Sequence, residues 1–186
     1  MSSRESMSVM NELLSHAVAR TAAVVRGIGE EQRGLPTPCA DFDVRALLGH
    51  LSWAAALFDA LARKEQAPPQ DDEHTAFESR AVGMVAAWSR PEAFEGDSPT
   101  MGMPMAVVFQ MGLSDIVIHG WDLARATGQD YEVDAETGET VAAFMRQMAP
   151  QGRQMGAFGE ELAVPEGVSP FDQALGLSGR DPEWKP

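Results

Sequence analysis

The stretch MAVVFQMGLSDIVIHGWDLARATG, residues 105–128, decides the fold that we expect for this chain. Six of its residues recur at spacings of three and four, which places them on one side of an α-helix; they are Val108, Gly112, Asp115, His119, Asp122 and Ala126. Gly128 is typical of the residue that follows the last turn of a helix. The stretch therefore predicts a helix over Met105–Thr127 with three polar side chains along one stripe.

The same spacing of apolar residues predicts further helices on both sides of this stretch. Their expected ranges are Glu5–Gly27, Val44–Lys64, Ala76–Arg90 and Ala135–Met148, with a polar linker over Gln66–Asp72. Asp43 and Asp134 are expected to cap two of these helices, and Pro150 is expected to end the last one. The chain has no alternation typical of strands. We therefore predict a single all-α domain over residues 1–186: a bundle of four main helices, an accessory helix and an irregular C-terminal tail packed against them.

The charge balance narrows the set of expected partners. The chain has 14 Lys and Arg residues against 28 Asp and Glu residues, a formal net charge of −14. Such an acidic surface repels nucleic-acid phosphates and anionic lipid headgroups, so neither nucleic acid nor membrane is an expected partner. No apolar run reaches the ~20 residues of a membrane-spanning helix, and no secretory signal is recognisable. With Cys39 as the single cysteine, these features predict a cytoplasmic protein.

Three side chains form a candidate metal site. Asp115 and His119 lie four residues apart, so they project side by side from one helix face. His50 lies on the core-facing stripe of the predicted helix Val44–Lys64. A bundle that packs these two helices face to face brings all three together, and such a two-histidine, one-carboxylate set leaves coordination positions open, as in catalytic zinc or non-haem iron sites. The alternative is that both histidines are core residues held by hydrogen bonds, one of them to Asp115.

Two neighbouring residues are expected to have ordinary structural roles. Cys39 precedes the helix that carries His50 by several residues, so we expect it to be a small residue in a turn and not a metal ligand. Asp122 lies three residues before Arg125, a spacing that favours an ion pair within one helix. The alternative for Asp122 is that it orients an imidazole.

Two longer motifs resemble a known family. They are Thr37-Pro-Cys-Ala-Asp-Phe-Asp-Val-Arg-Ala-Leu-Leu-Gly-His-Leu and Asp115-Ile-Val-Ile-His-Gly-Trp-Asp-Leu-Ala-Arg-Ala-Thr-Gly, and the closing Gly179-Arg-Asp-Pro is similar to the ends of short single-domain members. They resemble the DinB-like proteins related to the N-terminal domain of mycothiol-dependent maleylpyruvate isomerase, found in actinobacteria. The resemblance implies an antiparallel four-helix bundle that holds a divalent metal ion, often zinc or nickel. The positions that match its ligands are His50, Asp115 and His119.

The resemblance also implies a class of chemistry. A divalent ion in such a site lowers the pKa of a bound thiol. We therefore expect a divalent-metal-binding protein that acts as a metal-dependent thiol transferase or isomerase, with mycothiol as the thiol and a small molecule as the substrate. Maleylpyruvate isomerisation itself is not transferred, because the isomerase has an additional C-terminal domain. The alternatives are a metal-assisted hydrolase that needs no thiol and a non-catalytic metal-binding or ligand-binding module. A homodimer is a further expectation, from aromatic residues at helical spacing.

Overall fold

The computed structural model describes residues 3–70 and 74–186, and all regular secondary structure within them is helical. The α-helices are α1 (Ser3–Arg26), α2 (Val44–Ala62), α3 (Phe77–Trp88), α4 (Met105–Thr127), α5 (Ala135–Gln154) and α6 (Pro170–Leu177), and two short 3₁₀ helices span Glu30–Gln32 and Pro91–Phe94. The described residues contain no β-strand, so the predicted all-α fold is confirmed.

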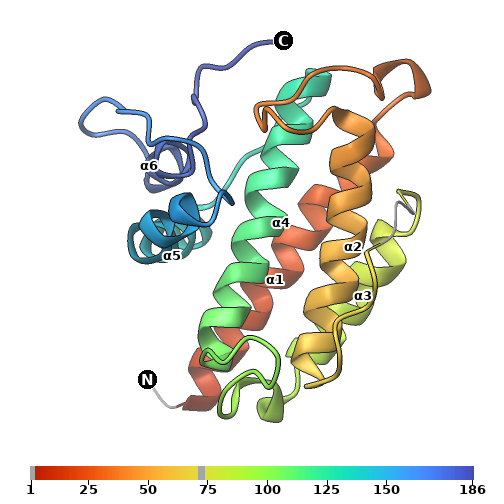
Figure 1. Ribbon diagram of the computed structural model, residues 1–186, viewed down its shortest axis with the longest axis vertical. Helices are drawn as coiled ribbons and strands as arrows, with labels where there is room; N and C mark the ends of the chain where they lie inside the picture. Colours follow the sequence, from red (N-terminus) through yellow and green to blue (C-terminus); the bar gives the residue numbers. More distant parts are fainter. Residues whose placement is uncertain (1–2, 71–73) are drawn as a thin grey trace.

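Helices α1 to α4 form a four-helix bundle (Figure 1). α1 and α4 run in one direction and α2 and α3 in the other, so the chain returns along the length of the bundle between α2 and α3 (Figure 1). α4 packs against α1 and α2, and α3 packs against α1 and α2. The predicted linker Gln66–Asp72 is part of the returning segment, and its last two residues lie outside the described residues. The α2–α4 pair is therefore antiparallel, and the two helices are in direct contact, as predicted.

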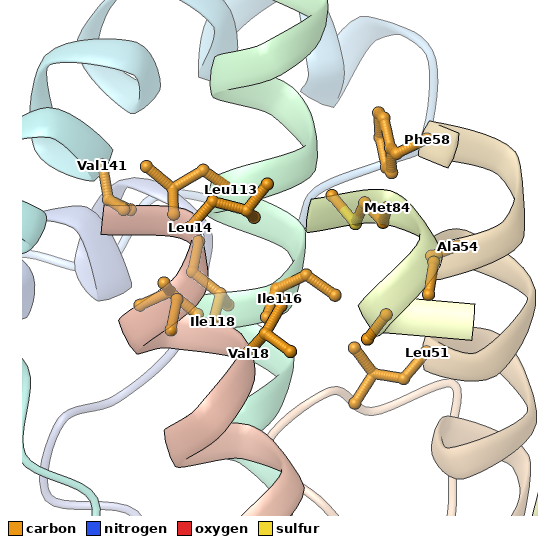
Figure 2. Close-up of a cluster of buried hydrophobic side chains, with 14 of the residues drawn as sticks. Leu14, Val18, Leu51, Ala54, Phe58, Met84, Leu113, Ile116, Ile118 and Val141 are labelled. Atoms are coloured by element: carbon orange, nitrogen blue, oxygen red, sulfur yellow. The ribbon is translucent and has the colours of Figure 1, made fainter. Parts of the chain in front are cut away.

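Apolar side chains from five helices meet in the core. Figure 2 shows Leu14 and Val18 of α1, Leu51, Ala54 and Phe58 of α2, Met84 of α3, Leu113, Ile116 and Ile118 of α4, and Val141 of α5 pointing towards one another. α4 passes close to α2, since a Cβ atom at Gly112 would lie only 2.9 Å from Cγ of Phe58. This close contact sets the distance between the two helices that carry the candidate ligands.

α2 is also the one helix in the described part of the chain that is long and apolar enough to cross a membrane. Length and composition do not distinguish a membrane span from the core helix of a bundle. More than half of its most apolar window is buried, 56%, and it packs against α3 and α4. We therefore interpret α2 as a core helix.

Helix α5 lies beside the bundle and is longer than predicted. Its N-terminus is capped as expected: the Asp134 side chain accepts a hydrogen bond from the backbone N–H of Thr137 at 2.8 Å. The predicted end at Pro150 is wrong, because α5 continues to Gln154. Proline removes the hydrogen bond to the carbonyl of Arg146, but both residues are exposed, so water can satisfy that carbonyl.

The C-terminal tail is only partly irregular. The expectation of an irregular tail is wrong for α6, which begins at Pro170 after the cap Ser169 and buries Phe171, Ala174 and Leu175. α6 packs against α5, away from the bundle axis. The segment after α6 then runs back towards the end of the bundle where α4 ends (Figure 1). That return brings the C-terminal residues close to the candidate site.

Candidate metal centre

The contact between α2 and α4 brings the three predicted ligands together. His50 Nε2 lies 3.4 Å from Asp115 Oδ1, and His119 Nε2 lies 3.6 Å from the same oxygen. The two imidazole rings are edge to face, with centroids 4.8 Å apart. One ligand atom from each of the three residues lies within 4.8 Å of the other two. The two-histidine, one-carboxylate set predicted from the sequence is therefore present as a cluster.

The contacts of the two histidines with Asp115 are long for hydrogen bonds, and their lengths suit a shared cation. Charge-assisted N–H···O bonds are usually about 2.7–2.9 Å long, shorter than the 3.4 and 3.6 Å measured between these nitrogens and Asp115 Oδ1. Two ligands of a tetrahedral zinc ion, each bonded at about 2.0–2.1 Å, lie about 3.3 Å apart. In addition, Asp115 Oδ2 is buried and has no hydrogen-bond partner among the described residues. Since buried polar atoms nearly always have a partner, this donor set suits a divalent ion.

The electrostatics of the cluster favour the metal-binding form of Asp115 but the protonated form of His50. Burial alone raises the pKa of Asp115, but the charge of His119 and the hydrogen bond from His50 outweigh it and hold the pKa below its ordinary value. The carboxylate is therefore ionised at neutral pH. Burial lowers the pKa of His50, but the hydrogen bond to Asp115 and its charge outweigh burial and raise the pKa. Metal binding at His50 therefore competes with a proton.

The cluster is accessible from outside. The side chains of His50 and Asp115 are 20% and 22% exposed, and that of His119 is 11% exposed. A site closed on all sides would hold an ion for structural purposes only. The partial exposure leaves room for a small molecule to approach the ligands.

The predicted ion pair between Asp122 and Arg125 is wrong. The fully buried Asp122 carboxylate accepts hydrogen bonds from His119 Nδ1 at 2.9 Å and from Arg180 Nη2 at 3.1 Å. Arg125 instead donates to the backbone carbonyl of Pro182 at 2.8 Å. The i,i+3 spacing only places two side chains on one side of a helix, and here Asp122 faces the interior, where other donors reach it. The alternative, an aspartate that orients an imidazole, agrees with this geometry.

Sequence reasoning missed Arg180. Its side chain is 5% exposed, and its Nε and Nη2 atoms donate to the two Asp122 oxygens at 3.3 and 3.1 Å. Its third contact is a hydrogen bond from Nη1 to the carbonyl of Ser178 at 3.0 Å. The available signal was the closing motif Gly179-Arg-Asp-Pro, to which the resemblance assigns no role. Because Arg180 lies outside any helix, no periodicity could place it beside Asp122.

Cys39 lies closer to the cluster than its distance along the chain suggested. Its Sγ atom is within 4.8 Å of ligand atoms of His119 and Asp122. The separation along the axis of α2 is misleading, because the preceding turn folds back, and Phe42 in that turn packs on His50 with ring centroids 5.3 Å apart. Burial raises the pKa of the Cys39 thiol to about 11, so it is protonated at neutral pH.

Comparison with known proteins agrees with the first of the two sequence motifs, at residues 37–51. Residues 14–100 match the family model of the mycothiol maleylpyruvate isomerase N-terminal domain. The predicted resemblance to this family is thereby confirmed for residues 14–100. The part that matches this mycothiol-related domain includes His50 and ends before Asp115 and His119, so the other two candidate ligands rest on the geometry of α4.

Two curated relatives extend the similarity over nearly the whole chain. Both are uncharacterized proteins of Mycobacterium tuberculosis, from strains CDC 1551 / Oshkosh and ATCC 25618 / H37Rv, and each is 29% identical over 188 residues. The alignment covers 92% of this chain and 98% of each relative. No solved structure is a significant match. The relatives are actinobacterial, as the resemblance implied, and their names state no activity.

Proposed function

We propose that this protein binds a divalent metal ion at His50, Asp115 and His119 and acts as a metal-dependent thiol transferase or isomerase on a small molecule. The observation that supports it most directly is the convergence of three ligand atoms, all within 4.8 Å of one another. Two imidazoles and one carboxylate are ligands that zinc accepts readily, and nickel is the second metal that we propose. The mycothiol-related family of residues 14–100 supports mycothiol as the thiol.

Each protein group has a defined part in this proposal. The two histidines would hold the ion through Nε2, and Asp115 would hold it through its carboxylate, whose Oδ2 has no hydrogen-bond partner in the described part of the chain. A divalent ion bound there stabilises the thiolate form of a small thiol, which is the nucleophilic form. The exposed edges of His50 and Asp115 would admit that thiol from solvent. The only cysteine of the chain does not supply the nucleophile, because its pKa of about 11 keeps it protonated.

Metal stoichiometry tests the first half of the proposal. We expect protein purified without chelator and then dialysed against zinc to contain close to one ion per chain. His50→Ala and His119→Ala should lose the ion, because each removes one of three ligands. His16→Ala is the matched control, since His16 is exposed on α1 and takes no part in the cluster. Each variant must retain the helical circular dichroism spectrum. A His50→Ala protein that is folded and still retains one ion would refute the site.

An activity comparison tests the second half. We expect the zinc-loaded protein to accelerate addition of mycothiol to small electrophiles, and a chelator to abolish the acceleration. Ester or amide hydrolysis without any thiol would favour the metal-assisted hydrolase instead. Zinc binding without either activity would favour the non-catalytic binding module. Homodimer formation, a cytoplasmic location and the single-domain organisation stay predictions.

A further inference from the structure

The buried carboxylate of Asp122, next to the candidate metal ligands, accepts three hydrogen bonds. Asp122 is fully buried and lies three residues after His119 on α4. Its Oδ2 atom accepts from His119 Nδ1 at 2.9 Å and from Arg180 Nη2 at 3.1 Å, and its Oδ1 atom accepts from Arg180 Nε at 3.3 Å. Only an ionised carboxylate can accept all three, since an amide in its place would turn its NH₂ towards at least one donor.

This contact determines which nitrogen of His119 faces the cluster. A neutral imidazole carries its proton on one nitrogen and a lone pair on the other. With Nδ1 donating to Asp122, the lone pair is on Nε2, the atom that lies 3.6 Å from Asp115 Oδ1. A lone pair in that place is what a metal ligand requires, and metal-binding histidines commonly have such a carboxylate behind them.

Arg180 balances the charge of Asp122. A carboxylate without solvent exposure is costly unless a cation with good hydrogen-bond geometry accompanies it. Arg180 is itself 5% exposed and reaches Asp122 from the segment that follows α6. That segment is held in place by the backbone hydrogen bond from Arg180 N to Leu175 O at 2.8 Å. The C-terminal segment thus supplies the cation that offsets the cost of burying the Asp122 carboxylate next to His119.

We propose that Asp122 and Arg180 are positioning residues of the metal site: Arg180 holds the Asp122 carboxylate, and Asp122 holds His119 with its Nε2 lone pair towards the ion. The C-terminal segment is thereby a functional part of the site, although it lies outside the 14–100 family match. This inference rests on the proposed metal binding. It adds two residues that touch neither the ion nor the substrate and act through one ligand.

Zinc affinity tests the inference. We expect Asp122→Asn and Arg180→Gln each to weaken zinc binding by about 10- to 100-fold in competition with a chromophoric chelator. Because both act through one contact, the double variant should bind zinc about as weakly as either single variant. It also leaves no unpaired buried charge, so it keeps the test valid if a single variant does not fold.

Arg125→Gln is the matched control. Arg125 also ties the C-terminal segment to α4, through the Pro182 carbonyl, without touching Asp122. Its loss should leave zinc affinity nearly unchanged. If Arg125→Gln weakens zinc binding as much as Arg180→Gln, the effect comes from docking of the segment and the inference is overturned.

A spectroscopic measurement separates this inference from the proposed function. In the metal-free protein near pH 8, ¹⁵N-resolved NMR of the histidine rings should show the proton of His119 on Nδ1, and Asp122→Asn should disturb that tautomer. A wild-type His119 protonated on Nε2 overturns the inference. Zinc binding that is equal in wild type and both variants overturns the inference alone. Failure of the wild type to bind zinc overturns the proposed function as well.

Discussion

Gly120, next to His119 on α4, is the position where one added methyl group should do the most damage. A Cβ atom there would lie 2.3 Å from Thr21 Oγ1 and 2.6 Å from the hydroxyl oxygen of Tyr131. These two hydroxyl groups are 2.8 Å apart and hydrogen-bonded to each other, and Thr21 also donates to the carbonyl of Ile116 at 3.2 Å. Gly120→Ala must therefore displace at least one hydroxyl group from a buried network that joins α1 to α4.

The size of the effect follows from opposing contributions. Overpacking costs about 1–3 kcal/mol, and each buried hydrogen bond left unmade costs about 1–3 kcal/mol. In the opposite direction, replacing glycine by alanine inside a helix stabilises the fold by about 1 kcal/mol. We therefore expect Gly120→Ala to lower the free energy of unfolding by about 2–4 kcal/mol. For a chain of this size the corresponding fall in Tm is roughly 5–15 °C.

Thermal and urea unfolding, followed by circular dichroism, measure this change. Gly83→Ala on α3 is the matched control, because its Cβ atom would meet the Asp59 side chain at an ordinary 3.7 Å. The same substitution should there leave stability unchanged or raise it by up to about 1 kcal/mol. If Gly120→Ala unfolds at the same temperature as Gly83→Ala, the close approach of Thr21 and Tyr131 to α4 is refuted.

Three further predictions concern the hydrophobic core, the stability of the fold at acid pH and the reactivity of the cysteine. Phe109→Ala removes a side chain that is 1% exposed and should lower the free energy of unfolding in urea by about 3–5 kcal/mol; a loss below about 1 kcal/mol would contradict its burial. Burial raises the pKa of Asp122, but the charges and hydrogen bonds of Arg180 and His119 together outweigh burial, and the folded pKa lies below the ordinary 3.8. Asp122 therefore contributes stability that is present above pH 3.8 and is lost as the pH falls through the folded pKa. In the metal-free protein, Asp122→Asn should therefore make the free energy of unfolding fall less steeply as the pH is lowered through this range. Since the pKa of Cys39 rises from 9.0 to about 11, its alkylation near neutral pH should be about 100-fold slower than that of an unburied thiol, and a rate equal to that of free cysteine would exclude the shift.

Features that depend on neighbouring residues were determined by the sequence. The three- and four-residue spacing of one stripe of side chains, together with Gly128 after its end, predicted α4 with its observed bounds. The caps Asp43 and Asp134 were recognisable because each bonds a backbone N–H only three residues ahead. The pairing of Asp115 with His119 is local too, since one turn of helix separates them. The position of His50 opposite them needed the family resemblance, because spacing alone does not say which helices touch.

Features that join distant parts of the chain were decided by the tertiary structure. Asp122 and Arg180 are 58 residues apart, and the ion pair forms because the segment after α6 returns to α4. Local spacing favoured Arg125 as the partner of the same carboxylate. Arg180 takes that place because its buried guanidinium donates two hydrogen bonds to Asp122. Helix α6 and the continuation of α5 past Pro150 depend on burial and on solvent, respectively, which short motifs do not specify. Periodicity and capping operate over one or two helical turns, whereas the partner of a buried charge is chosen by how the helices and the C-terminal segment pack.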